Sequence, residues 1–393
     1  MTNKEVFEKD KIYITHTYNR FNTALKSGHG SQAVDFDGKK YIDFGSGIGT
    51  NSLGFCDEQW IKAVVFQAKQ LQHTSNLFYT LPSAELAEQL CKITGYSNVF
   101  FGNSGAEANE GAIKAARKYG METKGRDCNR IITLKNSFHG RTVTTLSATG
   151  QDIFHQHFFP FTEGFQYISA NDIQELYNVV DTTVCAIMIE FVQGEGGVFA
   201  LSKDYVKAIE HVCKEKDILL IADEVQTGIG RTGTFLCSEQ YRVAPNIITL
   251  AKGLGGGLPI GAILYDETVK DVLQVGEHGS TFGGNPVVCA GALAVLKQVA
   301  NSDFLLSVCQ KSEYLRHKLL EMPEIMEISG LGLMIGISLL NKLNAKKIAS
   351  NCVDNGLLIL TAKDKLRILP PLNITYNEID AGLDILKKVF IEK

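Results

Sequence analysis

Apolar residues along this chain recur with two periods, and from about residue 58 stretches of the two kinds alternate. Helical spacing over residues 59–73 and 83–94 precedes the apolar run 98–101, and helical spacing over 105–119 precedes a second run at 130–134. The same alternation continues through strands expected at 184–189, 218–222, 247–251 and 260–264 and a helix at 202–216. Because the runs are apolar throughout, they are typical of strands buried on both faces. The pattern predicts an α/β protein with a mostly parallel sheet covered by helices on both sides.

The last quarter of the chain has a different pattern. Helices expected at 286–300 and 303–321 are followed by a strand at 332–338, a helix at 343–354, strands at 357–360 and 366–369, and a helix at 376–391. Near the N-terminus, Ala33–Phe44 reads as two short strands around an Asp-Gly turn. We therefore predict a large domain over residues 58–290, a smaller α+β domain over 291–393, and an N-terminal segment, 1–57, that packs with the smaller domain.

Composition narrows the functional classes. The 393 residues are 45% hydrophobic and 21% charged, and their formal net charge is −4. Without a basic block, nucleic acid is not an expected partner. No apolar run approaches the roughly 18–20 residues that span a bilayer, so no membrane association is expected. The first ten residues lack an apolar signal core, so we expect a cytoplasmic protein. The nine cysteines are scattered singly, which favours reduced thiols and no metal site.

The stretch Asn246–Gly261 carries the clearest chemical signal. A short apolar run ends at Lys252, and glycines follow at once. Burial lowers the pKa of an ammonium group, and the neutral amine can add to an aldehyde. Upstream, the apolar strand within Ile218–Val225 ends in an acid, Asp223. An amine and a carboxylate at the ends of two buried strands suit a pyridoxal phosphate site. There the lysine forms a Schiff base and the acid keeps the pyridine nitrogen protonated.

Further candidates follow other strands. Asn103–Asn109 begins a helix that Ser104 can cap, so free N–H groups could bind a phosphate. Taken alone, this segment is more typical of an ordinary strand–turn–helix connection. Phe138 could cover a ring and Arg141 could pair with a carboxylate, although by itself an aromatic next to a glycine is more often core or turn than ligand cover. Glu190 and Glu195 stand at and beyond a strand end, where ligands bind in open α/β sheets, so they are either near the site or solvated loop acids. His278–Pro286 supplies hydroxyls before a helix. Arg367, between Leu366 and Ile368, is a domain salt bridge or a carboxylate clamp, and the residues alone favour the salt bridge.

Several of these motifs occur together and in order, and they carry a resemblance. They are Ser104-Gly-Ala-Glu-Ala-Asn109, Phe138-His-Gly-Arg141, Asp223-Glu-Val-Gln-Thr-Gly228, Gly230-Arg-Thr-Gly233, Ala251-Lys-Gly253 and Gly279-Ser-Thr-Phe282. The chain resembles the class III, fold-type I pyridoxal phosphate-dependent aminotransferases over nearly its whole length, which implies a seven-stranded sheet in the large domain. Shorter motifs resemble the bacterial acetylornithine aminotransferases: Thr17-Tyr-Asn-Arg20, Ser46-Gly-Ile48, Asn51-Ser-Leu-Gly54 and Ser75-Asn-Leu-Phe-Tyr79.

The resemblance implies a role for each matching position. The catalytic pair would be Lys252, which forms the Schiff base, and Asp223, the partner of the pyridine nitrogen. The other cofactor contacts would be Gly105 and Ala106 at the phosphate, Phe138 and Val225 on the two ring faces, Glu224, Gln226 near the ring hydroxyl, and Thr281 on the phosphate of the neighbouring subunit. The substrate contacts would be Arg141 and Ser280 for acetylornithine, Arg367, neutralised in turn by Glu195, for glutamate, and Tyr18. Ala106 stands where the family usually has threonine, which removes a hydroxyl but not the backbone donor.

The implied protein is a homodimer with active sites at the subunit interface. It would move the δ-amino group of N2-acetyl-L-ornithine to 2-oxoglutarate in arginine biosynthesis, giving N-acetyl-L-glutamate 5-semialdehyde and L-glutamate. Four related activities stay open: ornithine, succinylornithine or 4-aminobutyrate aminotransferase, and glutamate-1-semialdehyde aminomutase. A nucleotide-binding protein is a further alternative, although no G-x-x-x-x-G-K-[ST] loop is present. A catalytically silent scaffold is another, which the presence of Lys252 and Asp223 argues against.

Overall fold

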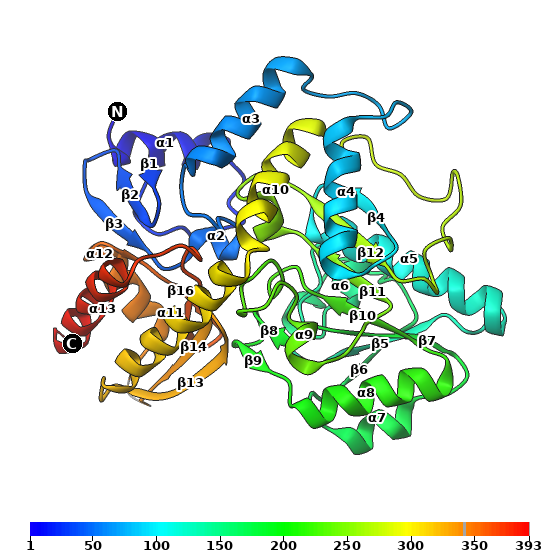
Figure 1. The fold of residues 1–393 in the computed structure, drawn as a ribbon. Coiled ribbons are helices and arrows are strands. Elements are labelled where there is room, and N and C mark those ends of the chain that lie inside the picture. The colour runs from blue at the N-terminus through cyan, green and yellow to red at the C-terminus, as the bar shows by residue number, and fades with distance from the viewer. Residues whose placement is uncertain (341–342, 393) are drawn as a thin grey trace.

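A seven-stranded sheet crosses the computed structural model, which describes residues 1–340 and 343–392 (Figure 1). Its strands, in spatial order, are β4 (Asn98–Gly102), β12 (Gly261–Tyr265), β11 (Ile247–Leu250), β10 (Leu219–Asp223), β7 (Val184–Ile189), β5 (Arg130–Leu134) and β6 (Phe165–Ile168). β12 pairs antiparallel with β11 and β4, and the other pairs are parallel. The predicted mostly parallel, seven-stranded sheet is confirmed.

Both faces of this sheet are covered, because successive side chains of a strand enter different apolar clusters. Along β7, Ile187 belongs to one cluster, together with residues of α8 (Lys203–Lys216), while Met188 belongs to another, together with residues of α5 (Gly105–Lys124). α5 packs against β7, β11 and β12, and α8 packs against β7 and β10. The uninterrupted apolar runs in the sequence are the direct consequence of this double cover.

Further helices lie between residues 58 and 320. They are α3 (Glu58–Gln70), α4 (Leu81–Thr94), α6 (Val143–Ala148), α7 (Ile173–Val179), α9 (Ser238–Tyr241), α10 (Pro286–Val299) and α11 (Ser302–Leu320), with the 3-10 turns η1 (Asp152–Phe154) and η2 (Lys252–Gly255). α10 packs against α3 and α4 and also contacts η2. No single helix among the described residues is long and apolar enough to cross a membrane. α10 and α11 together pass that test of length and composition, but they are bent by 72°.

Two smaller sheets lie beside the large one. The first contains β13 (Ile325–Leu331), β14 (Met334–Leu339), β17 (Lys365–Ile368) and β16 (Leu360–Ala362), and the second contains β1 (Leu25–His29), β2 (Gln32–Asp35), β3 (Lys40–Asp43) and β15 (Leu357–Leu358). β15 pairs in parallel with β3, so N-terminal and C-terminal residues share a sheet. α12 (Ala345–Asp354) packs against α13 (Tyr376–Ile391), and α13 packs against β3. The domain limits at residues 57 and 290 stay a prediction.

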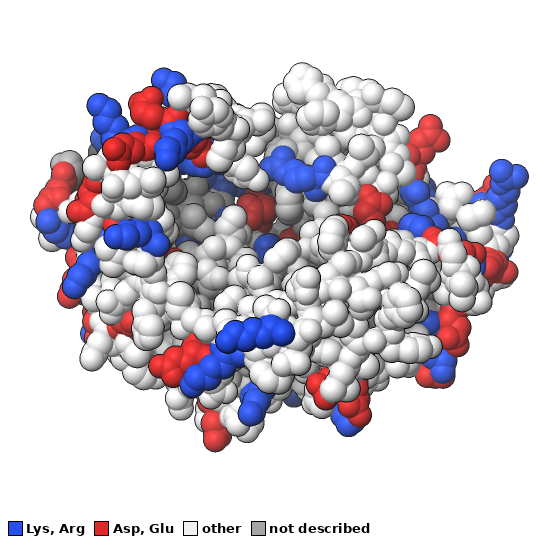
Figure 2. Space-filling model, turned by 90° about the horizontal axis from the view of Figure 1, so that it is seen from above, with Lys and Arg blue, Asp and Glu red and all other residues white. Residues whose placement is uncertain are grey.

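Several elements were not expected from the sequence. They include α1 (Asn3–Tyr13), α2 (Ser46–Gly49), β1, β6, β13, and the short pair β8 (Val192–Gln193) and β9 (Phe199–Ala200). The strand expected at 357–360 is divided between β15 and β16, which join different sheets. The helix expected to reach residue 73 ends at Gln70. On the surface, Figure 2 shows positively and negatively charged side chains interspersed on one face.

Candidate active site

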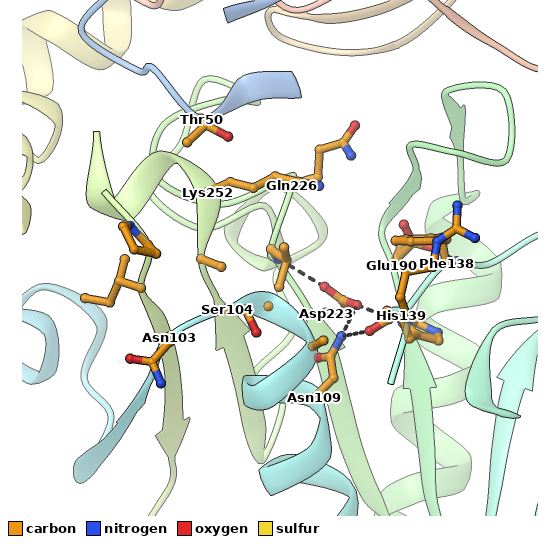
Figure 3. Close-up of a pocket in the computed structure, with 18 of the residues that line it drawn as sticks. Thr50, Asn103, Ser104, Asn109, Phe138, His139, Glu190, Asp223, Gln226 and Lys252 are labelled. Carbon is orange, nitrogen blue, oxygen red and sulfur yellow. Dashed lines mark hydrogen bonds and ion pairs between the residues drawn. The ribbon is translucent and has the colours of Figure 1, made fainter. Parts of the chain in front are cut away.

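A cavity of about 600 Å³ opens where the parallel strands of the large sheet end (Figure 3). Residues that line it follow the carboxyl ends of β4, β5, β7, β10 and β11, which meet at one edge because these strands run in the same direction. Nine of the predicted site residues line it: Tyr18, Gly105, Ala106, Phe138, Arg141, Asp223, Val225, Gln226 and Lys252. The fold therefore gathers into one cavity residues that are scattered over more than half of the chain.

Lys252 stands two residues beyond β11 and begins the turn η2. Its φ of 36° lies in the left-handed region, which non-glycine residues rarely occupy and which marks local backbone strain. The turn is held from two sides, because the Trp60 indole donates to the carbonyl of Gly255 at 3.0 Å and the Ser52 hydroxyl donates to that of Gly253 at 3.2 Å. Burial lowers the pKa of Lys252, although the charges of Glu195 and Asp223 oppose this shift. Burial thus shifts the pKa of Lys252 in the direction that the sequence predicted.

Asp223, the last residue of β10, is fixed by three donors. Its Oδ2 accepts from Asn109 Nδ2 and from His139 Nδ1, both at 2.8 Å, and its Oδ1 accepts from the backbone N–H of Val225 at 3.1 Å (Figure 3). Thr249 donates to Oδ1 of Asn109 at 2.7 Å, so the amide group of Asn109 is oriented toward Asp223. Sequence reasoning gave Asn109 and His139 no role of their own. Their presence in the motifs Ser104–Asn109 and Phe138–Arg141 was the sequence signal that could have identified them.

Glu190 follows β7 and also lines the cavity, as its position at a strand end predicted. It is buried, and its Oε2 accepts from the backbone N–H of Phe138 at 2.9 Å. Burial, reinforced by the charge of Asp223, raises the pKa of Glu190 well above its ordinary value. The two acids therefore differ, since Asp223 accepts hydrogen bonds from three donors whereas Glu190 is driven toward its protonated form.

The N-terminus of α5 lies on another wall of the cavity. The Ser104 hydroxyl caps the helix by accepting from the backbone N–H of Glu107 at 3.1 Å. Gly105 and Ala106 are the first residues of this 20-residue helix and line the cavity. A Cβ at Gly105 would stand 2.7 Å from Cγ1 of Val225, so the glycine is what lets the helix approach the end of β10. Backbone donors at a helix N-terminus suit a phosphate group.

Aromatic rings and one cation frame another part of the cavity. The guanidinium carbon of Arg141 lies 5.4 Å from the ring centre of Phe138 and 4.2 Å from that of Phe154. The two rings meet edge to face with centres 6.0 Å apart. Arg141 is exposed, and Tyr18 is 75% exposed on the cavity lining. Arg141 is thus a cation held by aromatic faces and open to an incoming carboxylate.

The second arginine is buried. Arg367 lies in β17, and its Nη1 pairs with Glu195 Oε1 at 2.5 Å. Burial alone would raise the pKa of Glu195, but the charge of Arg367 and its hydrogen bond outweigh that effect and lower it. Arg367 Nε is also buried and finds no acceptor among the described residues. Neither residue belongs to the cavity lining. The structure shows the salt bridge that the sequence favoured, and Arg367 Nε remains as a donor that could bind a carboxylate.

Three further predicted residues, besides Arg367 and Glu195, lie outside the lining of this cavity. Glu224 is buried and its carboxylate accepts from the backbone N–H groups of Cys237 at 2.5 Å and Ser238 at 2.9 Å, so its side chain holds the loop before α9 and faces away from the cavity. Ser280 lines a second cavity of about 450 Å³ and accepts from Asn103 Nδ2 at 3.0 Å. Thr281 is exposed next to it.

Comparison with known proteins places this arrangement in a family. Residues 13–390 match the family described as Aminotransferase class-III, and the chain belongs to this family. It is 52% identical to the acetylornithine aminotransferase of Haemophilus ducreyi, over 100% of both chains. It is also 47% identical to the acetylornithine aminotransferase of Caldanaerobacter subterraneus subsp. tengcongensis, over 98% of each chain. The predicted class of enzyme, a class III aminotransferase, is therefore confirmed.

Solved structures agree with this assignment. The ornithine aminotransferase of Toxoplasma gondii superposes with a TM-score of 0.94 at 33% identity, covering 100% of this chain and 96% of that one. The N-acetylornithine aminotransferase of Stenotrophomonas maltophilia superposes with a TM-score of 0.85 at 36% identity, covering 98% of each chain. Another structure of the Toxoplasma gondii enzyme records partial occupancy of PLP at its active site.

Proposed function

We propose that this chain transfers the δ-amino group of N2-acetyl-L-ornithine to 2-oxoglutarate, giving N-acetyl-L-glutamate 5-semialdehyde and L-glutamate in arginine biosynthesis. The full-length relatives named as acetylornithine aminotransferases support this substrate pair. The single observation that carries the proposal is the placement of two arginines at different depths. Arg141 is exposed beside the cavity, whereas Arg367 is buried and paired with Glu195. One enzyme can thereby accept carboxylates at two distances from the same reacting amine.

The residues of the cavity fit pyridoxal 5'-phosphate as the cofactor. The N–H groups of Gly105 and Ala106 would hold its phosphate, Asp223 would hold the proton of its pyridine nitrogen, and Lys252 would hold its aldehyde carbon. Phe138 and Val225 would cover the ring, and Gln226, whose buried Oε1 has no partner among the described residues, would meet the ring hydroxyl. When bound, the cofactor supplies an electron sink for the carbon that loses a proton.

Lys252 carries out the proton transfer in this proposal. Burial lowers its pKa and so favours loss of the ammonium proton, and the amine Nζ would then accept the proton leaving Cδ of the amino donor. Three hydrogen-bond donors hold the carboxylate of Asp223 in place. Phe138, which lines the cavity, would cover one side of the reacting atoms. The same groups run the sequence in reverse for 2-oxoglutarate.

Glu195 lets a single site serve both substrates. With acetylornithine bound, the α-carboxylate lies at the far end of the donor, within reach of Arg141, and Arg367 would be left as an unpaired buried charge. Glu195 neutralises it at 2.5 Å. When glutamate or 2-oxoglutarate enters, its α-carboxylate takes the place of Glu195 on the planar guanidinium, and the unused Nε offers a further donor.

A homodimer belongs to this proposal. Ser280 and Thr281 lie outside the cavity of their own chain, so they would act on the cofactor and substrate of the neighbouring subunit. Strongly exposed apolar residues surround them: Leu77 is 88% exposed, Phe78 69% and Phe282 60%. Asn76 ties the two segments together by donating to the carbonyls of Ser280 and Gly283, both at 2.9 Å. A second copy of the chain would cover this surface.

The two arginines provide the test. Arg141→Ala should slow the half-reaction with acetylornithine by about tenfold or more and change the glutamate half-reaction less, because each loses only its own charge-assisted pairing. Arg367→Ala should show the reverse order. Stopped-flow absorbance of the cofactor measures each half-reaction separately, and repeating it with ornithine as the donor compares the two activities named among the relatives. If both variants lose both half-reactions equally, the arginines do not divide the substrates and this assignment is wrong.

A further inference from the structure

A second buried arginine lies at the junction of three segments. Arg231 is 2% exposed, and its Nη1 donates to the carbonyls of Leu333 at 3.2 Å and Pro370 at 2.5 Å. Its Nη2 reaches the Ser46 hydroxyl at 3.5 Å. These acceptors come from the turn between β13 and β14, from the segment after β17, and from the N-terminal part of the chain.

A buried guanidinium is a costly way to join these segments. Burial lowers the pKa of Arg231, yet an arginine stays charged at neutral pH. The acid whose charge acts on it is Asp43, and the Oδ1 of Asp43 already accepts from the backbone N–H groups of Gly45 and Ser46. An apolar side chain of similar length would fill the space without the loss of hydration. The charge is therefore explained by the two carbonyls that it joins rather than by packing.

Those two carbonyls stand at the ends of the strand pair that carries Arg367. Leu333 immediately precedes β14, and Pro370 follows β17 by two residues. In the register of this pair, Gly336 lies opposite Arg367. The backbone of Arg231 adds a further link, since the Leu333 N–H donates to its carbonyl at 3.0 Å. Arg231 thus binds backbone groups next to both β14 and β17, at the end of the strand pair that is nearest to Arg367.

The other end of this connection is the cofactor side of the cavity. Arg231 belongs to the buried segment that continues from Asp223 beyond β10, and Gly228 N–H donates to the Glu224 carbonyl at 3.0 Å within it. The Ser46 hydroxyl donates to the carbonyl of Leu369 at 2.5 Å, which closes the network next to Pro370. A continuous series of bonded and hydrogen-bonded residues therefore connects Glu224, which follows Asp223 in the chain, to β17, the strand that carries Arg367.

We propose that Arg231 is a positioning residue that fixes Arg367 relative to Asp223 and Lys252, and that it thereby determines how well the site receives the α-carboxylate of glutamate and 2-oxoglutarate. This inference rests on the role of Arg367 given under the proposed function. It adds a residue that touches neither substrate nor cofactor and acts only through the placement of β14 and β17. The half-reaction with acetylornithine, which does not use Arg367, does not depend on this placement.

The test compares half-reactions of the holoenzyme with Arg231→Met and Arg231→Lys. Methionine keeps most of the length and loses every donor, while lysine keeps the charge but cannot join both carbonyls. In Arg231→Met, the glutamate concentration for half-maximal rate should rise by about tenfold and the acetylornithine value should stay within about twofold, because a small displacement of a binding group has a large effect. The glutamate concentration for half-maximal rate in Arg231→Lys should lie between those of wild type and Arg231→Met. Since each rate is measured per bound cofactor, a loss of folded protein leaves the ratio unchanged.

Arg316→Met is the matched control. Arg316 donates to the carbonyls of Ser329 and Gly332 at 3.5 Å, on the same hairpin as Leu333, but it does not join that hairpin to Pro370. Its removal should leave the ratio of the two half-reactions unchanged. Arg367→Lys serves as the reference, and in that background Arg231→Met should add little further loss.

The outcomes separate the two claims. A selective loss in Arg367→Lys together with an unselective loss in Arg231→Met overturns the positioning role alone. Full additivity of the two substitutions overturns it as well. An unselective loss in Arg367→Lys overturns the proposed role of Arg367, and the positioning role with it. Selective and non-additive losses in both support the positioning role.

Discussion

Asp223 and Glu224 are neighbours in the chain, yet their carboxylates face different surroundings. Successive residues at the end of a strand point to opposite faces of the sheet. Asp223 lines the cavity, while Glu224 accepts hydrogen bonds from the loop before α9. Glu224 was expected to contact the cofactor because of its position in the motif. Its side chain instead points toward the loop before α9. This geometry also leaves Glu224 as a buried acid with a testable pH dependence.

Glu224 should make the fold less stable as the pH rises. Burial raises its pKa from the ordinary value of 4.5 to about 7. Below 4.5 the carboxyl is protonated in both states, and its contribution to stability is fully present. Between 4.5 and about 7 the unfolded chain releases the proton while the folded chain keeps it, so on the order of 3 kcal/mol of stability is lost as the pH passes through this window.

The measurement is the denaturant midpoint at pH 5 and pH 8 for wild type and Glu224→Gln. Glutamine does not titrate, but its amide N–H₂ would face a backbone donor, so the variant should be less stable at pH 5. Its disadvantage relative to wild type should shrink toward pH 8. Titration of Glu190, whose pKa is also raised, cancels in this comparison. A constant difference between the two proteins across this range would contradict the raised pKa.

Residues at strand ends could be predicted from the sequence, while their partners could not. Lys252 and Asp223 each close an apolar run, which is a local pattern. Asn109 and His139 reach Asp223 from α5 and from the loop after β5, so their role depends on the order of strands in the sheet. That order is set by packing over the whole domain and leaves no periodic trace near either residue.

At the scale of elements, the buried strands were predicted well and the exposed elements poorly. α1 has a single buried residue, and its sequence signal is the capping box formed by Thr2 and Glu5 rather than an apolar stripe. β6 stands at the edge of the sheet, where its first three residues are only partly buried. Hydrophobic periodicity reports burial, so elements that bury little give a weak pattern.

The close approach of α5 to β10 leads to a prediction for Gly105. Gly105→Ala would place a methyl group 2.7 Å from Cγ1 of Val225, so helix and strand must separate. The N–H groups of Gly105 and Ala106 would then shift away from the phosphate position, and the dissociation constant of pyridoxal phosphate should rise by about tenfold or more. Equilibrium dialysis against pyridoxal phosphate measures this change.

A double variant provides the control. Val225→Ala removes the methyl groups that the new side chain would meet. It also removes the proposed contact of Val225 with one face of the cofactor ring. Gly105→Ala combined with Val225→Ala should therefore bind the cofactor better than the sum of the two single losses predicts. Simple additivity would show that steric contact between α5 and β10 is not the cause.

At the scale of the whole molecule, the surface around residues 76–79 and 280–283 is unusual for a monomer. Tyr79 is fully exposed, and Leu77, Phe78 and Phe282 are largely exposed next to Ser280 and Thr281. Contiguous apolar surface of this kind marks an interaction site. If a second copy of the chain covers it, each cavity would be completed by a threonine from the partner, and activity would belong to the pair of chains rather than to one.

Hybrid dimers test that arrangement. Lys252→Ala removes the amine, and Thr281→Asp places a negative charge where a phosphate would bind, so each variant alone should be inactive. In a hybrid purified through two different tags, the Thr281→Asp chain keeps Lys252 and receives an intact Thr281 from its partner, which gives one complete site in two. The hybrid should therefore show about half of the wild-type activity per dimer. A hybrid of Lys252→Ala with wild type sets that reference value. If Thr281 serves its own chain instead, both sites of the first hybrid are defective and no activity returns.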